Sequence, residues 1–286
     1  MPRIPPRDYF DVLDAIHVLT FPRTYVEVGV ASGRSLSIAR PGTLLVGVDP
    51  DASLGHPVSG PLALFRQTSD LFFAGRDLRN ALGAYPVDVA FIDGLHHFEV
   101  VLRDFRSLEA AAASESIILI HDCVPPSPRV AARDRETKLW TGDVWKAIVG
   151  LRQYRPDLKI EVLDVAPTGL AVVSELHPSS RVLYDRYEEI CAHLSSIVLP
   201  EDKDERTSFL GVTTPDWSTW NDQLPRYRNG LGTSRPARIR QLHPPIRHLT
   251  LDHARWRLRR WFRFSAFGRV VRGFMLRIGY DPNEAE

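Results

Sequence analysis

The chain has 286 residues, 44% of them hydrophobic and 25% charged, which leaves room for one large globular domain or one domain with an appendage. Two cysteines, Cys123 and Cys191, are too few for a disulfide framework and indicate a reducing, cytoplasmic compartment. We expect no signal peptide, and no apolar stretch is long enough to span a bilayer. The net charge of +1 hides an asymmetry: residues 226–277 contain fourteen arginines, no lysine and one acid. That segment carries +13 and the remainder −12, so we expect an acidic body with a basic tail.

The first predicted elements are a helix and two buried strands. Residues 8–20 carry apolar residues at helical spacing, and Asp8 can cap that helix. Residues 25–28 and 44–48 are apolar and β-branched, as strands buried on both faces are. A glycine turn and a helix are expected between these two strands.

The segment between the two strands carries a glycine motif. Gly29 and Gly33 bracket a tight turn, where residues without Cβ let the backbone bend and a ligand approach closely. Ser32 and Ser35 can cap the helix that follows. Asp49 comes directly after the second strand, where an acid can hold a ribose. The glycines are too few and too far apart to cradle a dinucleotide pyrophosphate, which argues against NAD.

Strands and helices alternate through the rest of the body. Such alternation predicts a mostly parallel sheet with helices on both faces. Only a short Pro-Thr-Gly turn separates the last two strands, so we expect a hairpin whose last strand is antiparallel. The predicted strands are 62–70, 87–92, 116–120, 159–165 and 169–173, and the predicted helices are 97–113 and 143–154.

The C-terminal third has a different character. Residues 182–198 are predicted to form a helix, and residues 200–245 a long loop or partly disordered segment, because they are polar, rich in Gly and Pro and without a period. Residues 249–278 form an arginine-rich amphipathic pattern. Such a helix suits an anionic membrane surface, with a peripheral location, or a protein contact such as a second copy or the acidic body. RNA is the weaker alternative, since the aromatic residues gather on one face.

The pattern Glu27-x-Gly29-x-x-x-Gly33, followed by Asp49, resembles the first motif of class I S-adenosylmethionine-dependent methyltransferases. The resemblance covers about residues 20–176. It implies a Rossmann-like α/β fold with a mostly parallel, seven-stranded sheet. It also implies that the turn passes around the methionine part of S-adenosyl-L-methionine and that Asp49 takes the ribose hydroxyls.

The resemblance also divides the chain. Residues 1–178 are expected to form the methyltransferase domain, and residues 179–286 a C-terminal extension with a helix, a long loop and the basic amphipathic helix. Ser69 and Asp70 end the third strand near the expected adenine, although an ordinary helix cap is the alternative. The predicted cofactor residues are Glu27, Gly29, Ser32, Gly33, Ser35, Asp49, Ser69, Asp70 and Asp93.

Polar side chains also follow the strands at 87–92 and 116–120. Asp93 and His96 come after the first of these, and His121 and Asp122 after the second. If the strands are neighbours, their axes lie roughly 5 Å apart, so the two carboxylates can converge. An open, oxygen-rich site favours Mg²⁺ or Mn²⁺ over zinc.

The segment from Asp93 to Asp122 resembles more closely a subfamily of metal-dependent O-methyltransferases that methylate sugar hydroxyls on macrolides and glycans. Phe98 stands where the family usually has Tyr, which removes a hydroxyl, and His121 stands where some relatives carry a second acid. The resemblance implies metal ligands Asp93, His121 and Asp122. The matching positions are Asp93, Gly94, His96, Glu99, Val101, Asp104 and Asp122.

Chemistry gives these residues roles. A sugar hydroxyl is a poor nucleophile, and a divalent cation can stabilise its developing alkoxide. His96 lies three residues after Asp93 and can remove the proton, at a position where the related catechol methyltransferases carry Lys. The methyl group then moves in line from sulfonium to oxygen. We therefore predict an O-methyltransferase that acts on a hydroxyl of a sugar, glycan or glycolipid, with His96 as base.

Several alternatives stay open at this point. His96 could cap a helix, His97 is the second candidate base, and Asp93 could contact only the cofactor. A small-phenol, catechol-like methyltransferase would keep the cofactor and the metal, whereas a membrane or RNA adaptor would keep only the fold. Aromatic residues that could line a sugar site, or belong to the core, are Trp140, Trp145 and Tyr154.

Overall fold

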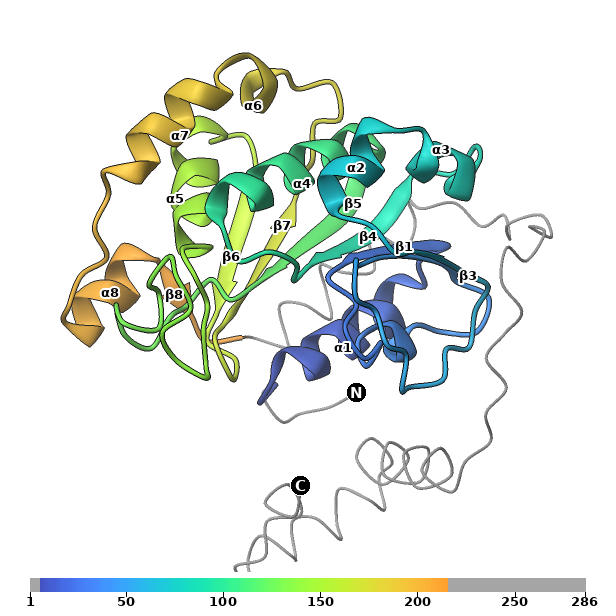
Figure 1. The fold of residues 1–286 in the computed structure, drawn as a ribbon, viewed down its shortest axis with the longest axis horizontal. Helices are drawn as coiled ribbons and strands as arrows, with labels where there is room; N and C mark the ends of the chain where they lie inside the picture. Colours follow the sequence, from blue (N-terminus) through green and yellow to red (C-terminus); the bar gives the residue numbers. More distant parts are fainter. Residues whose placement is uncertain (1–5, 216–286) are drawn as a thin grey trace, which may run out of the picture. The chain divides into compact units, whose positions relative to one another are not determined.

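The computed structural model describes residues 6–215, which form one sheet between two layers of helices (Figure 1). The strand order is β3-β2-β1-β4-β5-β7-β6-β8. The strands are β1 Thr24–Val28, β2 Leu44–Val48, β3 Leu62–Phe65, β4 Val87–Ile92, β5 Ala112–His121, β6 Lys159–Leu163, β7 Leu170–Ser174 and β8 Val212–Thr213. The helices are α1 Tyr9–Thr20, α2 Ser69–Ala74, α3 Asp77–Leu82, α4 Phe98–Ala110, α5 Trp145–Tyr154, α6 Val182–Asp185, α7 Tyr187–Ser195 and α8 Lys203–Phe209, with a 3₁₀ turn η1 at Leu36–Ile38.

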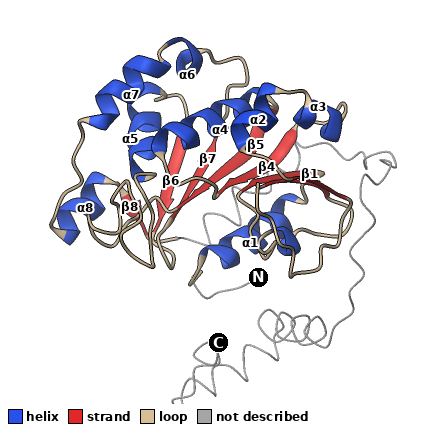
Figure 2. Cartoon of the chain, viewed as in Figure 1, coloured by secondary structure: helices blue, strands red, loops and turns tan. Residues whose placement is uncertain are grey.

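The central strands are buried on both faces, because successive side chains point to opposite sides of a sheet. Val26 and Ala90 belong to the core under α4 and α5, and Tyr25 and Val89 belong to the core under α1 and η1. Figure 2 shows α1 on one side of the strands and α4, α5 and α7 on the other. The expected helices on both faces are therefore confirmed.

The sheet is mostly parallel, as predicted. β3, β2, β1, β4 and β5 pair in parallel, and β7 runs antiparallel to both β5 and β6. The expected hairpin is thus β6–β7, closed by the turn around Gly169, which has φ of +75°. The strand order reverses between β1 and β4, so the crevice at their carboxyl ends is where an open α/β sheet binds ligands.

Two sequence-based expectations about elements were wrong. The sheet has eight strands rather than seven, because Val212–Thr213 pairs in parallel with β6. This strand and α8 occupy part of the region 200–245, for which a loop was expected. A two-residue strand has no period to read, although Asp202 does supply a cap, accepting from the backbone N–H groups of Asp204 and Glu205. The prediction for 182–198 was closer: a break at Arg186 divides that segment into α6 and α7.

The helix expected after the glycine turn is also absent: the described chain has only the short η1 there. Ser35 precedes η1 but makes no capping bond, because its hydroxyl donates to the Glu27 carboxylate instead. Residues 34–40 end at Pro41, which has no backbone N–H and cannot continue a helix.

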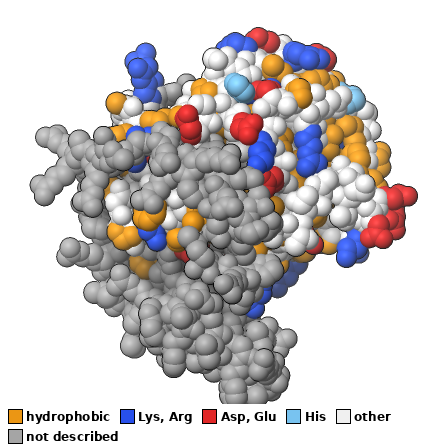
Figure 3. All heavy atoms as spheres, turned by 180° about the vertical axis from the view of Figure 1, so that it is seen from behind, with side chains coloured by type: hydrophobic (Ala, Val, Ile, Leu, Met, Phe, Trp, Pro, Cys, Tyr) orange, Lys and Arg blue, Asp and Glu red, His pale blue; other side chains and the backbone are white. Residues whose placement is uncertain are grey.

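The segment 179–215 packs on the same body as the sheet, since α7 lies against α5 and β8 extends the sheet. The proposed boundary at residue 178 stays a prediction. The basic amphipathic segment 249–278 lies outside the described residues. Among the described residues, no helix is long and apolar enough to cross a membrane. Seen from behind, their surface mixes acidic, basic and hydrophobic side chains (Figure 3).

Candidate active site

The candidate site lies where β4 and β5 end. The two strands are parallel neighbours with Ile92 opposite Ile120, so the residues that follow them come out at one edge of the sheet. Asp93 follows β4 and is held by a hydrogen bond from its backbone N–H to the Val28 carbonyl, 2.8 Å. Asp122 follows β5 with a left-handed backbone, φ of +60°. This backbone ends the strand and turns the chain at the site.

Asp93, His96 and Asp122 converge there. Each offers one ligand atom, and these atoms lie within 4.8 Å of one another. His96 Nε2 lies 3.1 Å from Asp122 Oδ2 and 3.7 Å from Asp93 Oδ1. Asp122 is buried, whereas Asp93 and His96 are each about one-fifth exposed at the side chain. The two strand ends therefore form an acidic cluster that stays open to a small ligand.

His121 lies against the same two carboxylates but deeper. Its Nδ1 is 3.1 Å from Asp93 Oδ1 and 3.5 Å from Asp122 Oδ2. Burial by itself lowers the pKa of His121, but the charge of Asp93 and the bonds to both carboxylates outweigh it and raise the pKa to about 10. An imidazolium here holds the two carboxylates together. The predicted ligand role of His121 stays a prediction, and this geometry favours the role of a counter-charge.

His96 is held by its other ring nitrogen. Nδ1 lies 2.9 Å from the Trp140 carbonyl, and the two rings stack with centroids 5.0 Å apart. With Nδ1 donating to that carbonyl, the protonated ring directs its Nε2–H at Asp122, and the neutral ring has its lone pair at Nε2. Burial lowers the pKa of His96, but hydrogen bonding to Asp93 and the charges of Asp122 and Asp93 raise it overall. The ring is thus oriented to accept a proton beside two carboxylates.

Asp143 fixes the loop that carries His96. Its backbone N–H donates to the His96 carbonyl, 3.2 Å, and its Oδ1 accepts from the Phe98 backbone N–H at the start of α4, 3.0 Å. Arg133 pairs with its Oδ2 at 2.9 Å. A cavity of about 620 Å³ lies behind this loop and is lined by Asp143 but by none of the three cluster residues. The geometry that carries the chemistry is therefore the convergence of charges at the strand ends, not that cavity.

The glycine turn touches the same place. Gly29 has φ of +89°, and a Cβ there would lie 1.9 Å from the Asp93 carbonyl oxygen. Asp49 braces the turn, because its Oδ2 accepts from the Ala31 backbone N–H at 2.7 Å. Gly33 packs against Leu54, where a Cβ would lie 2.6 Å from a methyl group. The turn thus packs against the backbone of Asp93 and Gly94, and Asp49 also acts within the protein, while the cofactor roles of these residues stay predictions.

Glu27 lies beneath the turn and is fully buried. Tyr25 Oη donates to one carboxylate oxygen at 2.8 Å, and the Ser35 hydroxyl donates to the other. Burial raises the pKa of Glu27 to about 8, although these hydrogen bonds oppose the shift. The residue therefore ties β1 to the segment after the turn. Ser32, also predicted to bind cofactor, is exposed at the rim of the turn.

The residues expected near an adenine have partners within the fold. Thr68 caps α2, and Ser69 and Asp70 form its first turn. Arg103 engages both oxygens of Asp70 at 2.7 Å. Burial raises the pKa of Asp104 to about 7, with the Ser69 side chain opposing the shift. The helix cap expected at Ser69 and Asp70 is thus one residue earlier, at Thr68, and the cofactor role of these two residues stays a prediction.

Other residues of the site carry little sequence signal. Thr168 donates to Asp122 from the β6–β7 turn, and Tyr9 of α1 stacks on His121 with ring centroids 4.1 Å apart. The sequence marks Thr168 only as a turn residue and Tyr9 only as part of a helix. Trp140 lies at the site, whereas Trp145 is buried in a separate core cluster and Tyr154 packs beside His193. Only contacts between distant segments reveal these assignments.

Comparison with known families bears on this geometry. Residues 26–123 match a family model described as a methyltransferase domain. The matched range is about a third of the chain and runs from β1 to just past β5, so it contains the glycine turn and the acidic cluster. This match supports the predicted enzyme class, a methyltransferase, at that level. A comparison with curated protein sequences gives no significant match.

Several solved structures described as O-methyltransferases are similar to this chain. TomG from Streptomyces achromogenes, involved in tomaymycin synthesis and bound to SAM, is 15% identical, covers 58% of this chain and 78% of its own, and has a TM-score of 0.43. A putative O-methyltransferase from Klebsiella pneumoniae is 14% identical, with 58% and 79% covered and a TM-score of 0.44. One from Bacillus cereus in complex with SAH is 13% identical, with 58% and 79% covered and a TM-score of 0.42. Likeness of this degree says nothing about acceptor or mechanism.

Proposed function

We propose that this protein is an S-adenosylmethionine-dependent O-methyltransferase that methylates a hydroxyl of a sugar, as part of a glycan, glycolipid or other sugar-containing molecule. The observation that carries the proposal is the convergence of Asp93, His96 and Asp122 beside a glycine turn, inside a range that matches a methyltransferase domain. A methyl donor at the turn and a hydroxyl at the cluster are neighbours in this arrangement.

His96 is the proposed general base. Its Nε2 lies between the two carboxylates, 3.1 Å from Asp122 Oδ2 and 3.7 Å from Asp93 Oδ1, and its Nδ1 is occupied by the Trp140 carbonyl. A raised pKa makes the ring a stronger proton acceptor, while the Asp122 carboxylate stabilises the imidazolium that forms. The chain's part in the reaction is then to align the acceptor hydroxyl with the methyl group and to take up its proton.

The cluster also fits a divalent cation. Two carboxylates and an imidazole, with one atom from each within 4.8 Å, are the donor set that Mg²⁺ or Mn²⁺ uses in open sites. We propose Asp93 and Asp122 as its ligands, with either His121 or His96 beside them. A bound cation would supply Lewis-acid stabilisation of the acceptor alkoxide.

One aromatic side chain, Trp140, lies at the site and is compatible with the proposed acceptor. Trp140 is half-buried, stacks on His96 and is fixed by a bond from its indole N–H to the Ala132 carbonyl, 2.7 Å. A rigid ring beside the base suits a sugar face, and it equally suits a catechol ring, which keeps a small phenol as the second candidate acceptor.

The direct test is methyl transfer from labelled S-adenosylmethionine to a panel of saccharides and catechols, with and without EDTA. We expect saccharides to be methylated and chelation to suppress the activity. Methylation of catechols alone would overturn the sugar assignment, and activity untouched by EDTA would remove the metal. Failure to bind S-adenosylhomocysteine by calorimetry would favour the non-catalytic adaptor over any methyltransferase.

The role of His96 has its own test. We expect His96→Ala to lower turnover by roughly 10²–10⁴-fold, the usual contribution of a general base, while Mn²⁺ and S-adenosylhomocysteine bind as before. His97→Ala is the matched control, since His97 is the neighbouring imidazole and no cluster contact involves it among the described residues. Loss of Mn²⁺ affinity in His96→Ala would make His96 a ligand instead of the base.

Association of residues 249–278 with an anionic membrane surface, or with a second copy of the chain, stays a prediction from the sequence. Co-sedimentation of the full chain with vesicles containing anionic lipid tests the first, and light scattering in solution tests the second.

A further inference from the structure

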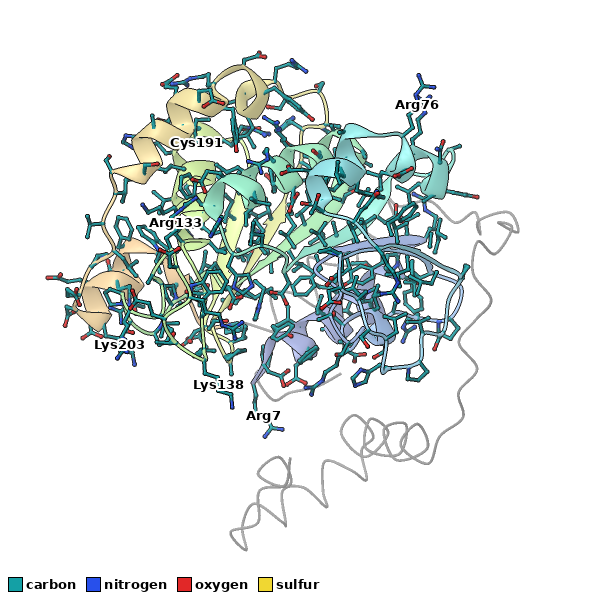
Figure 4. All side chains as sticks on the ribbon, in the orientation of Figure 1. Arg7, Arg76, Arg133, Lys138, Cys191 and Lys203 are labelled. Carbon is teal, nitrogen blue, oxygen red and sulfur yellow. The ribbon has the colours of Figure 1, made fainter. Side chains whose placement is uncertain are left out.

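The chain between β5 and α5, residues 122–144, contributes to two sides of the candidate active site. Asp122 stands at its start, and Trp140 near its end holds His96 through the backbone carbonyl and the ring. This β5–α5 segment, all of it described, has no helix or strand of its own, so contacts with other elements must set its position. Lys138, late in the segment, points away from the fold (Figure 4).

The start of the β5–α5 segment is fixed by Arg206 of α8, which lies beside it (Figure 1). The guanidinium donates to the Pro125 carbonyl through Nε, at 3.1 Å, and to the Pro126 carbonyl through Nη2, at 2.6 Å. Its Nη1 donates to the carbonyls of Pro200 and Glu201, both at 3.0 Å. One planar group therefore ties the start of the segment to the residues that lead into α8.

Arg206 is an unusual residue for a purely structural contact. Its side chain is buried, with 5% of the residue exposed, and it forms no ion pair among the described residues. Burying a charge costs free energy unless polar groups surround it, and here backbone carbonyls do so. A guanidinium has five N–H donors spread in a plane and reaches carbonyls on both sides, whereas the ammonium of lysine has three donors at one point.

Two further sets of contacts connect the segment to the site. The Val124 backbone N–H donates to the Thr168 carbonyl at 2.7 Å, and the Thr168 hydroxyl donates to Asp122. Further along, the Thr141 backbone N–H donates to the Val130 carbonyl at 3.0 Å, next to the indole that stacks on the proposed base. A shift at the start of the segment therefore reaches both the carboxylate and the aromatic side of the site.

We propose that Arg206 is a positioning residue of the active site, which holds the β5–α5 segment in the geometry that binds the acceptor. The inference rests on the proposed function, because it takes the acceptor hydroxyl to bind beside Asp122 and Trp140. It gives α8, which lies outside the range that matches the methyltransferase domain, a part in acceptor binding and none in cofactor binding.

The test uses Arg206→Lys in the full chain, which keeps the charge but cannot reach both sets of carbonyls. We expect amide hydrogen exchange, measured by mass spectrometry, to become about tenfold or more faster in residues 124–144 and to stay unchanged in β1 and β4. For a saccharide that the wild type methylates, KM should rise about tenfold, while KM for S-adenosylmethionine stays within about twofold. Lower stability alone reduces the fraction of active enzyme, and hence the apparent kcat, without changing either KM.

Arg155→Lys is the matched control. Arg155 is also a buried arginine, but it donates to Glu109 and Asp157, ahead of β6, which begins at the edge of the sheet opposite to the site. This variant should lower stability and leave the acceptor KM and the exchange of residues 124–144 as in the wild type. Arg206→Gln, which removes the buried charge together with the donors, is the second variant if Arg206→Lys does not fold, and the same results are expected of it.

Three results would overturn the proposal. They are unchanged exchange in residues 124–144, faster exchange over the whole chain, and faster exchange in residues 124–144 with an unchanged acceptor KM. Failure of the proposed function is a different result: the wild type would then methylate no compound of the saccharide and catechol panel. In that case the exchange measurement alone decides whether Arg206 holds the β5–α5 segment.

Discussion

Glu27 and Asp93 are carboxylates at the same edge of the sheet, yet their surroundings differ. Glu27 is buried beneath the glycine turn with two neutral hydroxyls as partners, and burial raises its pKa to about 8. Burial acts on Asp93 in the same direction, but His121 and His96 outweigh it and lower its pKa. At Glu27 two hydroxyl donors do not outweigh burial, whereas at Asp93 two imidazolium groups do. The first carboxylate belongs to the frame of the turn, and the second is charged and available for chemistry.

The contact between the glycine turn and the backbone of Asp93 gives the prediction with the largest expected effect. Gly29→Ala should destabilise the fold by about 2–4 kcal/mol and abolish S-adenosylhomocysteine binding, because its Cβ would meet the Asp93 carbonyl oxygen at 1.9 Å and the Gly94 Cα at 2.7 Å. Backbone atoms cannot rotate away, so the turn and the end of β4 must separate. Urea unfolding and calorimetry measure the two effects.

Gly42→Ala separates this clash from backbone strain. Gly42 also has a left-handed φ, +92°, but a Cβ there would meet nothing within 4 Å. We expect it to cost about 1 kcal/mol and to leave binding intact. If both variants bind S-adenosylhomocysteine equally well, the close approach of the turn to Asp93 does not matter for the cofactor.

The raised pKa of Glu27 predicts a pH dependence of stability, an effect of intermediate size. With a pKa of about 8 folded and about 4.5 unfolded, the folded protein holds the proton over a range in which the unfolded chain has lost it. Stability should therefore fall as pH rises from about 4.5 to 8 and level off above. Glu27→Gln removes this titration, so its free energy of unfolding relative to that of the wild type should rise by up to a few kcal/mol between about pH 4.5 and 8. Thermal unfolding from pH 5 to 9 measures it, and parallel curves for the two proteins would mean that Glu27 is ionised when folded.

The contrast between these regions also shows how far the sequence could be interpreted. The apolar runs predict the strands of the sheet and its hairpin, because strand formation depends on local pattern. The positions of Asp93 and Asp122, each directly after a strand, predict where the two carboxylates meet, because parallel neighbouring strands end at one edge of the sheet. β8 has two residues and no pattern. The contact of Tyr9 with His121 joins segments far apart in the chain, and no local signal encodes it. The same holds for the choice of His96 or His121 as the imidazole nearest the open side, since both follow predicted strands equally well.

The smallest expected effect concerns Asp70, for which the sequence leaves a cofactor role and a structural role open. Both of its carboxylate oxygens accept from Arg103, and the pair is largely exposed. Asp70→Asn should therefore cost less than about 1 kcal/mol and leave S-adenosylhomocysteine affinity unchanged. Glu189→Gln, which removes an exposed pair with Arg186 on α7, is the control for the loss of one surface charge. If Asp70→Asn alone bound S-adenosylhomocysteine about ten times more weakly, Asp70 would be a cofactor residue. A carboxylate that only links α2 to α4 would not change the affinity for this ligand.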